Sequence, residues 1–178
     1  MQHQGYERIM REGYLDDLAA RPLEEVRAMR AECQAVEADL SYLRRLVQGR
    51  LDIAAAEVRR REAGEPAPDP DALVASLAHT LAEHAPAASR KVHTGALGPA
   101  TPDDSLTAEL DELCDGRRLA ELPEMDLVPL LSLVEDLTAL EREVSTRRAA
   151  TFQRLDALSA EITRRYRTGE ASVDSLLR

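Results

Sequence analysis

The sequence predicts an all-α protein in which two long helices form an antiparallel coiled-coil hairpin, with short accessory helices and a long flexible connection. Three observations predict this fold: the composition, the spacing of the apolar residues and a polar pattern that occurs twice. The 178 residues are 31% charged and 3% aromatic, with no tryptophan. So few aromatic side chains do not predict a thick globular core, whereas narrow seams between long helices fit the composition.

The first 20 residues are expected to form a polar tail and a short helix. Apolar residues between Tyr6 and Ala20 recur at helical spacing, which predicts one amphipathic helix. Gly13 weakens this helix because glycine has a low helix propensity. The segment is a candidate cap for the bundle or a docking element for a partner.

The first long helix is expected over residues 21–63. Pro22 suits its first turn, and Gly64 followed by Pro66 marks its end. Its apolar residues run at spacings of three and four, which is the seam of a helix that packs against another helix. They are Val26, Met29, Cys33, Val36, Leu40, Leu43, Val47, Leu51, Ala54 and Val58. A helix of roughly 40 residues is a rod of about 60 Å, which needs a packed partner.

Residues 64–124 are expected to form an acidic connection rich in proline and alanine. Between positions 64 and 126 the sequence holds thirteen acidic and four basic residues. Two short helices are predicted here, over Asp71–His84 and over Ser105–Cys114, the second ending before Gly116. The acidic stretch is either a solvated linker or a surface that meets a basic protein partner.

The second long helix is expected over residues 125–168, with Pro129 tolerated in its first turn and a tail over residues 169–178. Its seam repeats the first at a shift of 104 positions and turns polar at Arg147 and Thr151. The seam positions are Leu130, Leu133, Leu137, Leu140, Val144, Arg147, Thr151, Leu155, Leu158 and Ile162. An antiparallel pairing of the two rods is favoured over a parallel one, because its connection needs no long return.

A polar pattern lies beside each seam. The first copy is Glu37, Ser41, Arg44, Gln48 and Asp52, and the second is Glu141, Ser145, Arg148 and Asp156, with Phe152 at the position of Gln48. The copies are 104 positions apart throughout (141−37, 145−41, 148−44, 156−52). Each motif residue follows a seam residue by one position, so it lies about 100° round the helix from the seam. On antiparallel helices the two stripes are related by an approximate twofold axis, which suits a ligand with twofold symmetry.

These residue types indicate a ligand that carries both phosphate and a donor-rich base. Arginine pairs bidentately with phosphate or with the O6 and N7 atoms of guanine, and its flat guanidinium stacks on a base. Serine donates to phosphate oxygen, and carboxylates accept from the N–H groups of guanine. A guanine nucleotide therefore fits the stripe, and Phe152 is a candidate to stack on its base. The alternative is that the charged residues are ordinary interhelical salt bridges beside a coiled-coil seam.

Other function classes are disfavoured. The formal net charge is −10 and no basic face is evident, so direct nucleic-acid binding is not expected. The sequence lacks a glycine-rich phosphate loop and a nucleophile with a paired base, so no catalytic residues are assigned and an enzyme is not expected. His79 and His84 turn to different sides of a helix, which disfavours a metal site. Cys33 is interpreted as a small apolar seam residue.

No apolar run reaches the roughly 18 residues of a membrane span, and the N-terminus lacks a secretion signal. A cytoplasmic protein without membrane contact is therefore expected.

The pattern E-x3-S-x2-R-x3-Q-x3-D, present once on each of two long helices, resembles the signature of the RsiG-type anti-sigma factors of actinomycetes. The first copy matches completely, and the second departs from the pattern only at Phe152. The resemblance implies that the paired motifs bind two intercalated molecules of cyclic di-GMP. It also implies that the loaded protein holds a sporulation sigma factor of the WhiG type away from RNA polymerase.

The resemblance therefore implies a cyclic di-GMP site made by both copies. Its residues are Glu37, Ser41, Arg44, Gln48, Asp52, Glu141, Ser145, Arg148, Phe152 and Asp156. The remaining hypothesis, from another class, is a ligand-independent coiled-coil adaptor in which the stripe consists only of salt bridges.

Overall fold

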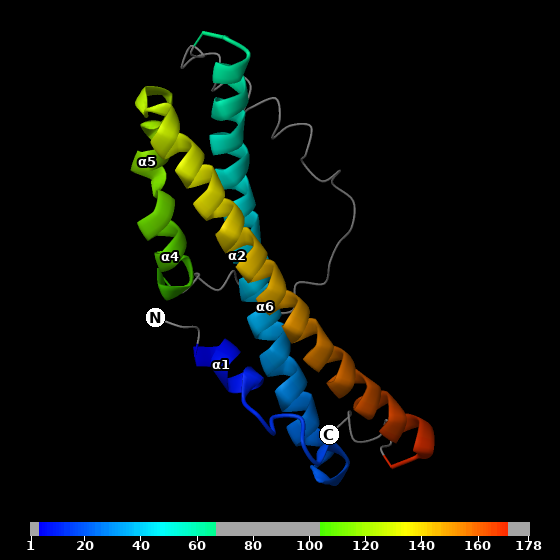
Figure 1. Cartoon of the computed structure of the whole chain (residues 1–178). Helices are drawn as coiled ribbons and strands as arrows, with labels where there is room; N and C mark the ends of the chain where they lie inside the picture. Colours follow the sequence, from blue (N-terminus) through cyan, green and yellow to red (C-terminus); the bar gives the residue numbers. More distant parts are fainter. Residues whose placement is uncertain (1–3, 67–103, 171–178) are drawn as a thin grey trace, which may run out of the picture.

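The protein is a helical hairpin, shown in Figure 1 as a computed structural model that describes residues 4–66 and 104–170. Its two long helices are α2, Leu23–Glu62, and α6, Leu127–Thr168. All regular structure in the described ranges is helical, which confirms the predicted all-α class. No helix within these ranges is long and apolar enough to cross a lipid bilayer.

The two long helices run in opposite directions. At one end of the hairpin Arg27, near the start of α2, contacts Tyr166, near the end of α6. At the other end Arg61 donates through Nη1 to the backbone oxygen of Met125, at 2.5 Å, just before α6 begins. The residue numbers rise along one helix as they fall along the other, so the pairing is antiparallel (Figure 1).

The core is the narrow seam between α2 and α6. The buried seam residues of α2 are Val26, Met29, Cys33, Val36, Leu40, Leu43, Val47 and Ala54, and those of α6 are Leu130, Leu133, Leu137, Leu140, Val144, Thr151 and Leu158. Thr151 is fully buried, and its hydroxyl donates to the backbone oxygen of Arg147 at 3.0 Å. Because that bond satisfies the hydroxyl within its own helix, the seam can turn polar here without leaving a buried donor unpaired.

The prediction of a single helix over Tyr6–Ala20 is wrong. Helix α1 spans Gln4–Met10, and a separate 3-10 turn, η1, spans Leu18–Ala20. Between them Gly13 has a φ of 78° and Asp17 a φ of 55°. Both angles lie in the left-handed region, so the backbone cannot continue as one right-handed helix from Tyr6 to Ala20, and the effect of Gly13 is larger than the predicted weakening.

Residues 104–126, the described part of the segment before α6, contain three short elements. Helix α4 spans Asp104–Cys114, close to the predicted Ser105–Cys114. As predicted, α4 ends before Gly116, which is the first residue of the next helix, α5, Gly116–Ala120. The Asp115 side chain caps α5 by accepting from the backbone N–H of Arg118 at 2.8 Å. A 3-10 turn, η2, Leu122–Glu124, leads into α6, while the predicted helix over 71–84 and the tail over 171–178 lie outside the described residues.

Two arginines hold the short helices against the hairpin. Arg50 Nη1 donates to the backbone oxygens of Leu110 and Cys114 in α4, at 3.0 and 2.6 Å. Arg154, 104 positions later, donates through Nε to the backbone oxygen of Ile9 in α1 at 2.6 Å. Because both arginines precede a seam position by one residue, α1 and α4 lie on the same face of the hairpin.

The repeat at 104 positions therefore extends well beyond the motif. The turns η1 and η2 begin at Leu18 and Leu122, and α2 and α6 begin at Leu23 and Leu127. Each half of the chain is thus a unit that contains a short helix, a 3-10 turn and a long helix in the same order, and the second half has the additional short helix α5 before its turn. The antiparallel pairing relates the two units by an approximate twofold axis that crosses the middle of the hairpin.

Candidate ligand-binding site

The motif residues form one polar face of the hairpin. They follow the seam by one position on both helices, and the antiparallel pairing brings the two stripes to the same side. This ligand face is opposite the face that Arg50 and Arg154 use to hold α4 and α1. Seven of the predicted residues are half-buried there: Glu37, Ser41, Arg44, Gln48, Glu141, Ser145 and Arg148.

Arg44 crosses from α2 to the motif residues of α6. Its Nε donates to Oε1 of Glu141 at 2.9 Å and to the hydroxyl of Ser145 at 3.0 Å. Ser145 in turn donates to the same carboxylate oxygen at 2.9 Å. One arginine, one serine and one glutamate therefore make a closed triangle across the helix interface.

Arg148 makes the reciprocal contacts from α6 to α2. Its Nε donates to Oε1 of Glu37 at 3.0 Å and to the hydroxyl of Ser41 at 2.8 Å, and Ser41 donates to that oxygen at 2.6 Å. Every contact in this second triangle corresponds to one in the first after a shift of 104 positions. The structure thus brings six of the predicted residues into one twofold-related cluster.

Both arginines keep donors free within this cluster. The hydrogen bonds of Arg44 and Arg148 use only Nε, and the four Nη atoms donate to no residue in the described ranges. Their side chains are 36% and 33% exposed. A guanidinium with both Nη atoms open to solvent matches the two oxygens of a phosphate group.

Gln48 and Phe152, which occupy the one motif position where the two copies differ, also make different contacts. Gln48 donates through Nε2 to Oε1 of Glu141 at 3.3 Å, and so joins the first triangle. Phe152 instead lies under the guanidinium of Arg148, with 4.8 Å between the guanidinium carbon and the ring centre. That distance is within the range of a cation–π contact.

The two motif aspartates are not brought into the cluster. Asp52 and Asp156 are exposed, one turn beyond Gln48 and Phe152. Neither makes a hydrogen bond or an ion pair with any residue in the part of the chain that the structure describes. Each carboxylate therefore remains available as an acceptor at an outer edge of the ligand face.

A second repeated cluster, at the ends of the hairpin, was missed from the sequence. Glu57 accepts from Arg60 (Nε, 2.8 Å; Nη2, 2.6 Å) and from Nε of Arg61 at 2.6 Å. Glu161, 104 positions later, accepts from the equivalent arginines, from Nε and Nη2 of Arg164 at 2.8 and 2.9 Å and from Nε of Arg165 at 2.6 Å.

These end clusters tie each 3-10 turn to the end of a long helix. Arg61 also donates to the backbone oxygen of Leu122 in η2, and Arg165 to that of Leu18 in η1. Hydrogen bonds from Arg60 and then Arg61 lower the pKa of Glu57 to about 2, and those from Arg164 and Arg165 lower the pKa of Glu161 to about 2. The signal for this cluster was present in the sequence, because E-x2-R-R recurs at the same offset as the motif.

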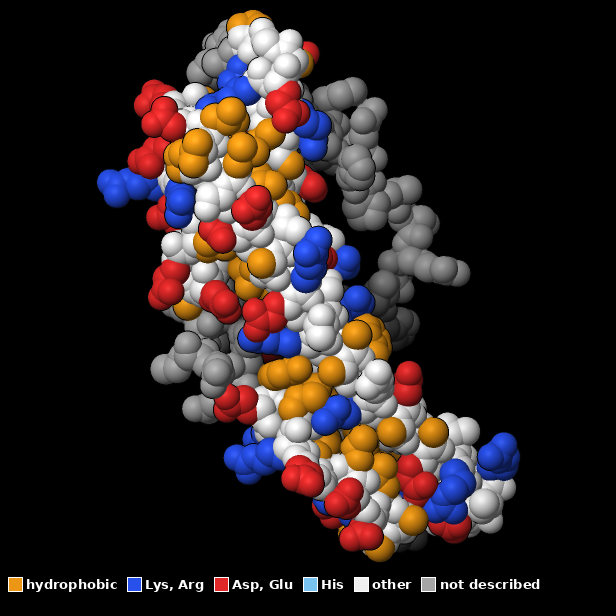
Figure 2. All heavy atoms as spheres, in the orientation of Figure 1, with side chains coloured by type: hydrophobic (Ala, Val, Ile, Leu, Met, Phe, Trp, Pro, Cys, Tyr) orange, Lys and Arg blue, Asp and Glu red, His pale blue; other side chains and the backbone are white. Residues whose placement is uncertain are grey.

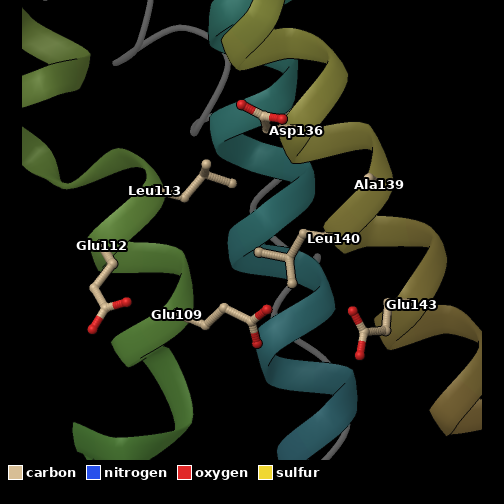
Figure 3. Close-up of a pocket in the computed structure, with 7 residues that line it drawn as sticks. All are labelled: Glu109, Glu112, Leu113, Asp136, Ala139, Leu140 and Glu143. Atoms are coloured by element: carbon tan, nitrogen blue, oxygen red, sulfur yellow. The ribbon is translucent and has the colours of Figure 1, made fainter.

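A hollow of about 490 Å³ lies between α4 and α6 and does not overlap the motif. Figure 3 shows carboxylates from both helices around it. It is lined by Glu109, Glu112, Leu113, Asp136, Ala139, Leu140 and Glu143. Four carboxylates would repel a phosphate, so this hollow does not suit the anionic ligand that the motif predicts.

The exposed apolar residues are unevenly distributed over the two units. Leu127, Val128 and Leu131 are 48%, 78% and 41% exposed at the start of α6, where apolar side chains gather in Figure 2. The equivalent positions of α2 hold Leu23, Glu24 and Arg27. The fold therefore accepts charged side chains at the last two of these positions, so Val128 and Leu131 are not required to be apolar for packing.

The fold and the cluster define a two-helix hairpin protein with a twofold-related Arg–Ser–Glu site on one face. Residues 12–80 match the family model described as RsiG-like, and the matched segment includes helix α2 and the first motif copy. The resemblance inferred from the motif is thus confirmed for this segment, and an RsiG-like family suggests an anti-sigma factor role. No curated protein matches the chain.

Proposed function

We propose that this protein is an anti-sigma factor that binds cyclic di-GMP through the two motif copies and, when loaded, sequesters a sigma factor of the WhiG type. In this proposal the protein is a regulator that catalyses no reaction, and the nucleotide is a regulatory ligand. The family match supports the anti-sigma class. The geometry of the motif cluster supports the ligand.

One observation carries the ligand assignment: two arginines related by an approximate twofold axis expose their Nη atoms on one face. Cyclic di-GMP has two phosphates and two guanines related by its own twofold axis. Arg44 and Arg148 would each donate to a phosphate or to the acceptor edge of a guanine. Two half-sites that correspond in position would hold two ligand molecules.

The remaining motif residues fit the other ligand atoms. Ser41 and Ser145 lie within 3.0 Å of the arginine Nε atoms, so their hydroxyls are close to any phosphate held there. Asp52 and Asp156 are exposed acceptors, which suit the N–H donors on the Watson–Crick edge of guanine. Phosphate-binding groups thus lie centrally and base-binding groups lie at the edges.

Ligand binding would be linked to partner binding through the hairpin itself. A nucleotide held between the stripes contacts α2 and α6 at once, so it would hold the two helices in one relative position. A sigma factor that recognises that position would bind more tightly when ligand is present, and by linkage would tighten ligand binding by the same factor. Ligand concentration would then control sequestration.

A second candidate is a ligand-independent coiled-coil adaptor. The specific observation in its favour is that Arg44 and Arg148 already pair with Glu141 and Glu37 across the seam. Half-exposed pairs of this kind are worth only about 0–1 kcal/mol each, so they do not prevent a ligand from replacing them. These ion pairs nevertheless connect the two long helices in the absence of a ligand.

Calorimetric titration of cyclic di-GMP, with and without the sigma factor and with GTP as control, tests the proposal. We expect Arg44→Ala and Asp156→Ala to lose ligand binding and, with it, sigma binding, while helicity is retained. Arg45→Ala is the matched control, because this neighbouring arginine is exposed and, among the described residues, donates only to the backbone oxygen of Ser41 in its own helix, at 3.2 Å. Ligand affinity equal to wild type in both motif variants would contradict the site assignment.

A further inference from the structure

The two halves of the ligand site are chemically different, although the fold makes them equivalent in position. Gln48 and Phe152 occupy the same place in the two stripes, 104 positions apart. Among the residues of the two triangles and these two neighbours, this is the single exchange between the copies. Any difference in how the halves bind a ligand should therefore begin at this pair.

The difference between Gln48 and Phe152 changes the number of hydrogen bonds that each glutamate accepts. Oε1 of Glu141 accepts from Arg44, Ser145 and Gln48. Oε1 of Glu37 accepts from Arg148 and Ser41 alone among the described residues, because the phenylalanine ring has no hydrogen to donate. The half-site around Arg44 is thus the more completely hydrogen-bonded of the two.

The exchange also places an aromatic surface on the ligand face. Phe152 is the one phenylalanine of the chain, is 39% exposed and belongs to no part of the buried core. The Arg148 guanidinium lies over the ring at 4.8 Å, so the side chain is held beside the arginine instead of packing into the seam. The exposed part of the ring is a surface on which a planar base can stack.

We infer that the half-site of Arg148 and Phe152 stacks a purine base of the ligand, whereas the half-site of Arg44 and Gln48 binds its ligand through hydrogen bonds alone. This inference rests on the proposed function and deepens it. The two bound nucleotides are then inequivalent, and binding takes place in two steps of different affinity. The stacking half-site fills first, because stacking adds to the arginine contact.

The absence of tryptophan from the sequence allows a direct test. In Phe152→Trp the introduced indole is the sole tryptophan, and its emission should be quenched as cyclic di-GMP is titrated. The matched variant Gln48→Trp gives the other half-site the aromatic face that it lacks, so we expect its emission to be quenched over the same ligand range as that of Phe152→Trp and the two binding steps to merge into one. Emission of Phe152→Trp that stays constant while calorimetry shows binding would overturn the inference.

Calorimetry of two further variants separates stacking from simple apolar packing. Phe152→Gln restores the repeated pattern, and we expect it to weaken the tighter step by on the order of tenfold and to leave one class of sites. Phe152→Leu keeps an apolar side chain without an aromatic face and should lose the same step. Wild-type affinity in either variant would overturn the stacking role and leave the proposed function intact. A wild-type protein that binds no cyclic di-GMP would overturn the proposed function and this inference together.

Discussion

At the scale of single residues, the arginines of this protein are used in two distinct ways. Arg61 and Arg165 donate to backbone oxygens of the 3-10 turns and to one glutamate each, so they stabilise the ends of the hairpin. Arg44 and Arg148 use only Nε and leave both Nη atoms open on the ligand face. Both pairs of arginines recur in the sequence 104 positions apart. Only their contacts in the structure distinguish a structural arginine from one that can bind a ligand.

The end clusters of Glu57 and Glu161 predict that the stability of the protein decreases at acid pH. The pKa of Glu57 and of Glu161 is lowered from 4.5 to about 2 in the folded protein, so the stability they contribute is present above about pH 4.5 and is lost as the pH falls toward 2. We expect Glu57→Gln/Glu161→Gln to be less stable than wild type above pH 4.5. Its unfolding free energy should fall less steeply than that of wild type between pH 4.5 and 2, as measured by urea denaturation.

Glu62→Gln is the control for this experiment. Glu62 is the exposed last residue of α2 and makes no ion pair with any residue that the structure describes. Its removal should leave the slope of stability against pH unchanged. A double variant whose slope equals that of wild type would show that the two carboxylates are not held in their charged form by their arginines.

At the scale of elements, α6 presents a fully buried row and an exposed apolar row on neighbouring faces. Leu137 is 0% exposed in the seam, whereas Val128 and Leu131 are 78% and 41% exposed. We expect Leu137→Ala to lower the unfolding free energy by about 2–5 kcal/mol, because it leaves a cavity between two rigid helices. Thermal and urea unfolding measure this loss.

The matched variant is Val128→Glu/Leu131→Arg, which gives α6 the residues that α2 has at the equivalent positions. Because the first unit carries Glu24 and Arg27 there, we expect a change of no more than about 0.5 kcal/mol at each position. A large loss of stability in this variant would show that the exposed apolar residues are part of the core after all.

At the scale of the whole molecule, the approximate twofold axis makes the ligand face a property of the hairpin and not of either helix. Each triangle takes its arginine from one long helix and its serine and glutamate from the other. Neither half of the chain therefore contains a complete half-site. A ligand bound there stabilises the paired helices relative to the separated ones.

This coupling predicts that cyclic di-GMP raises the melting temperature. At a ligand concentration of one hundred times Kd, binding to the folded state alone would add about 2.7 kcal/mol per site. We expect a concentration-dependent rise in Tm with cyclic di-GMP and none with GTP, measured by circular dichroism at 222 nm. An unchanged Tm at saturating cyclic di-GMP would favour the ligand-independent adaptor instead.

The long helices, the seam and the stripe can all be predicted from the amino-acid sequence. Apolar spacing of three and four over the stretch that holds Val26 to Val58 is a local signal, and a residue one position after each seam residue must lie on one face of its helix. The same local reasoning failed at Gly13, because a low helix propensity does not reveal a left-handed backbone angle.

Which residues contact one another across the seam depends on how the two long helices pack. Arg44 and Glu141 are 97 positions apart, and their contact depends on the axial register of two antiparallel helices, which the spacing within either helix does not fix. The same register sets Gln48 on the carboxylate of Glu141 across the seam, whereas Phe152 meets Arg148 four residues earlier on its own helix. A local sequence pattern places a side chain on a face, whereas only the packing of the helices selects its partner across the seam.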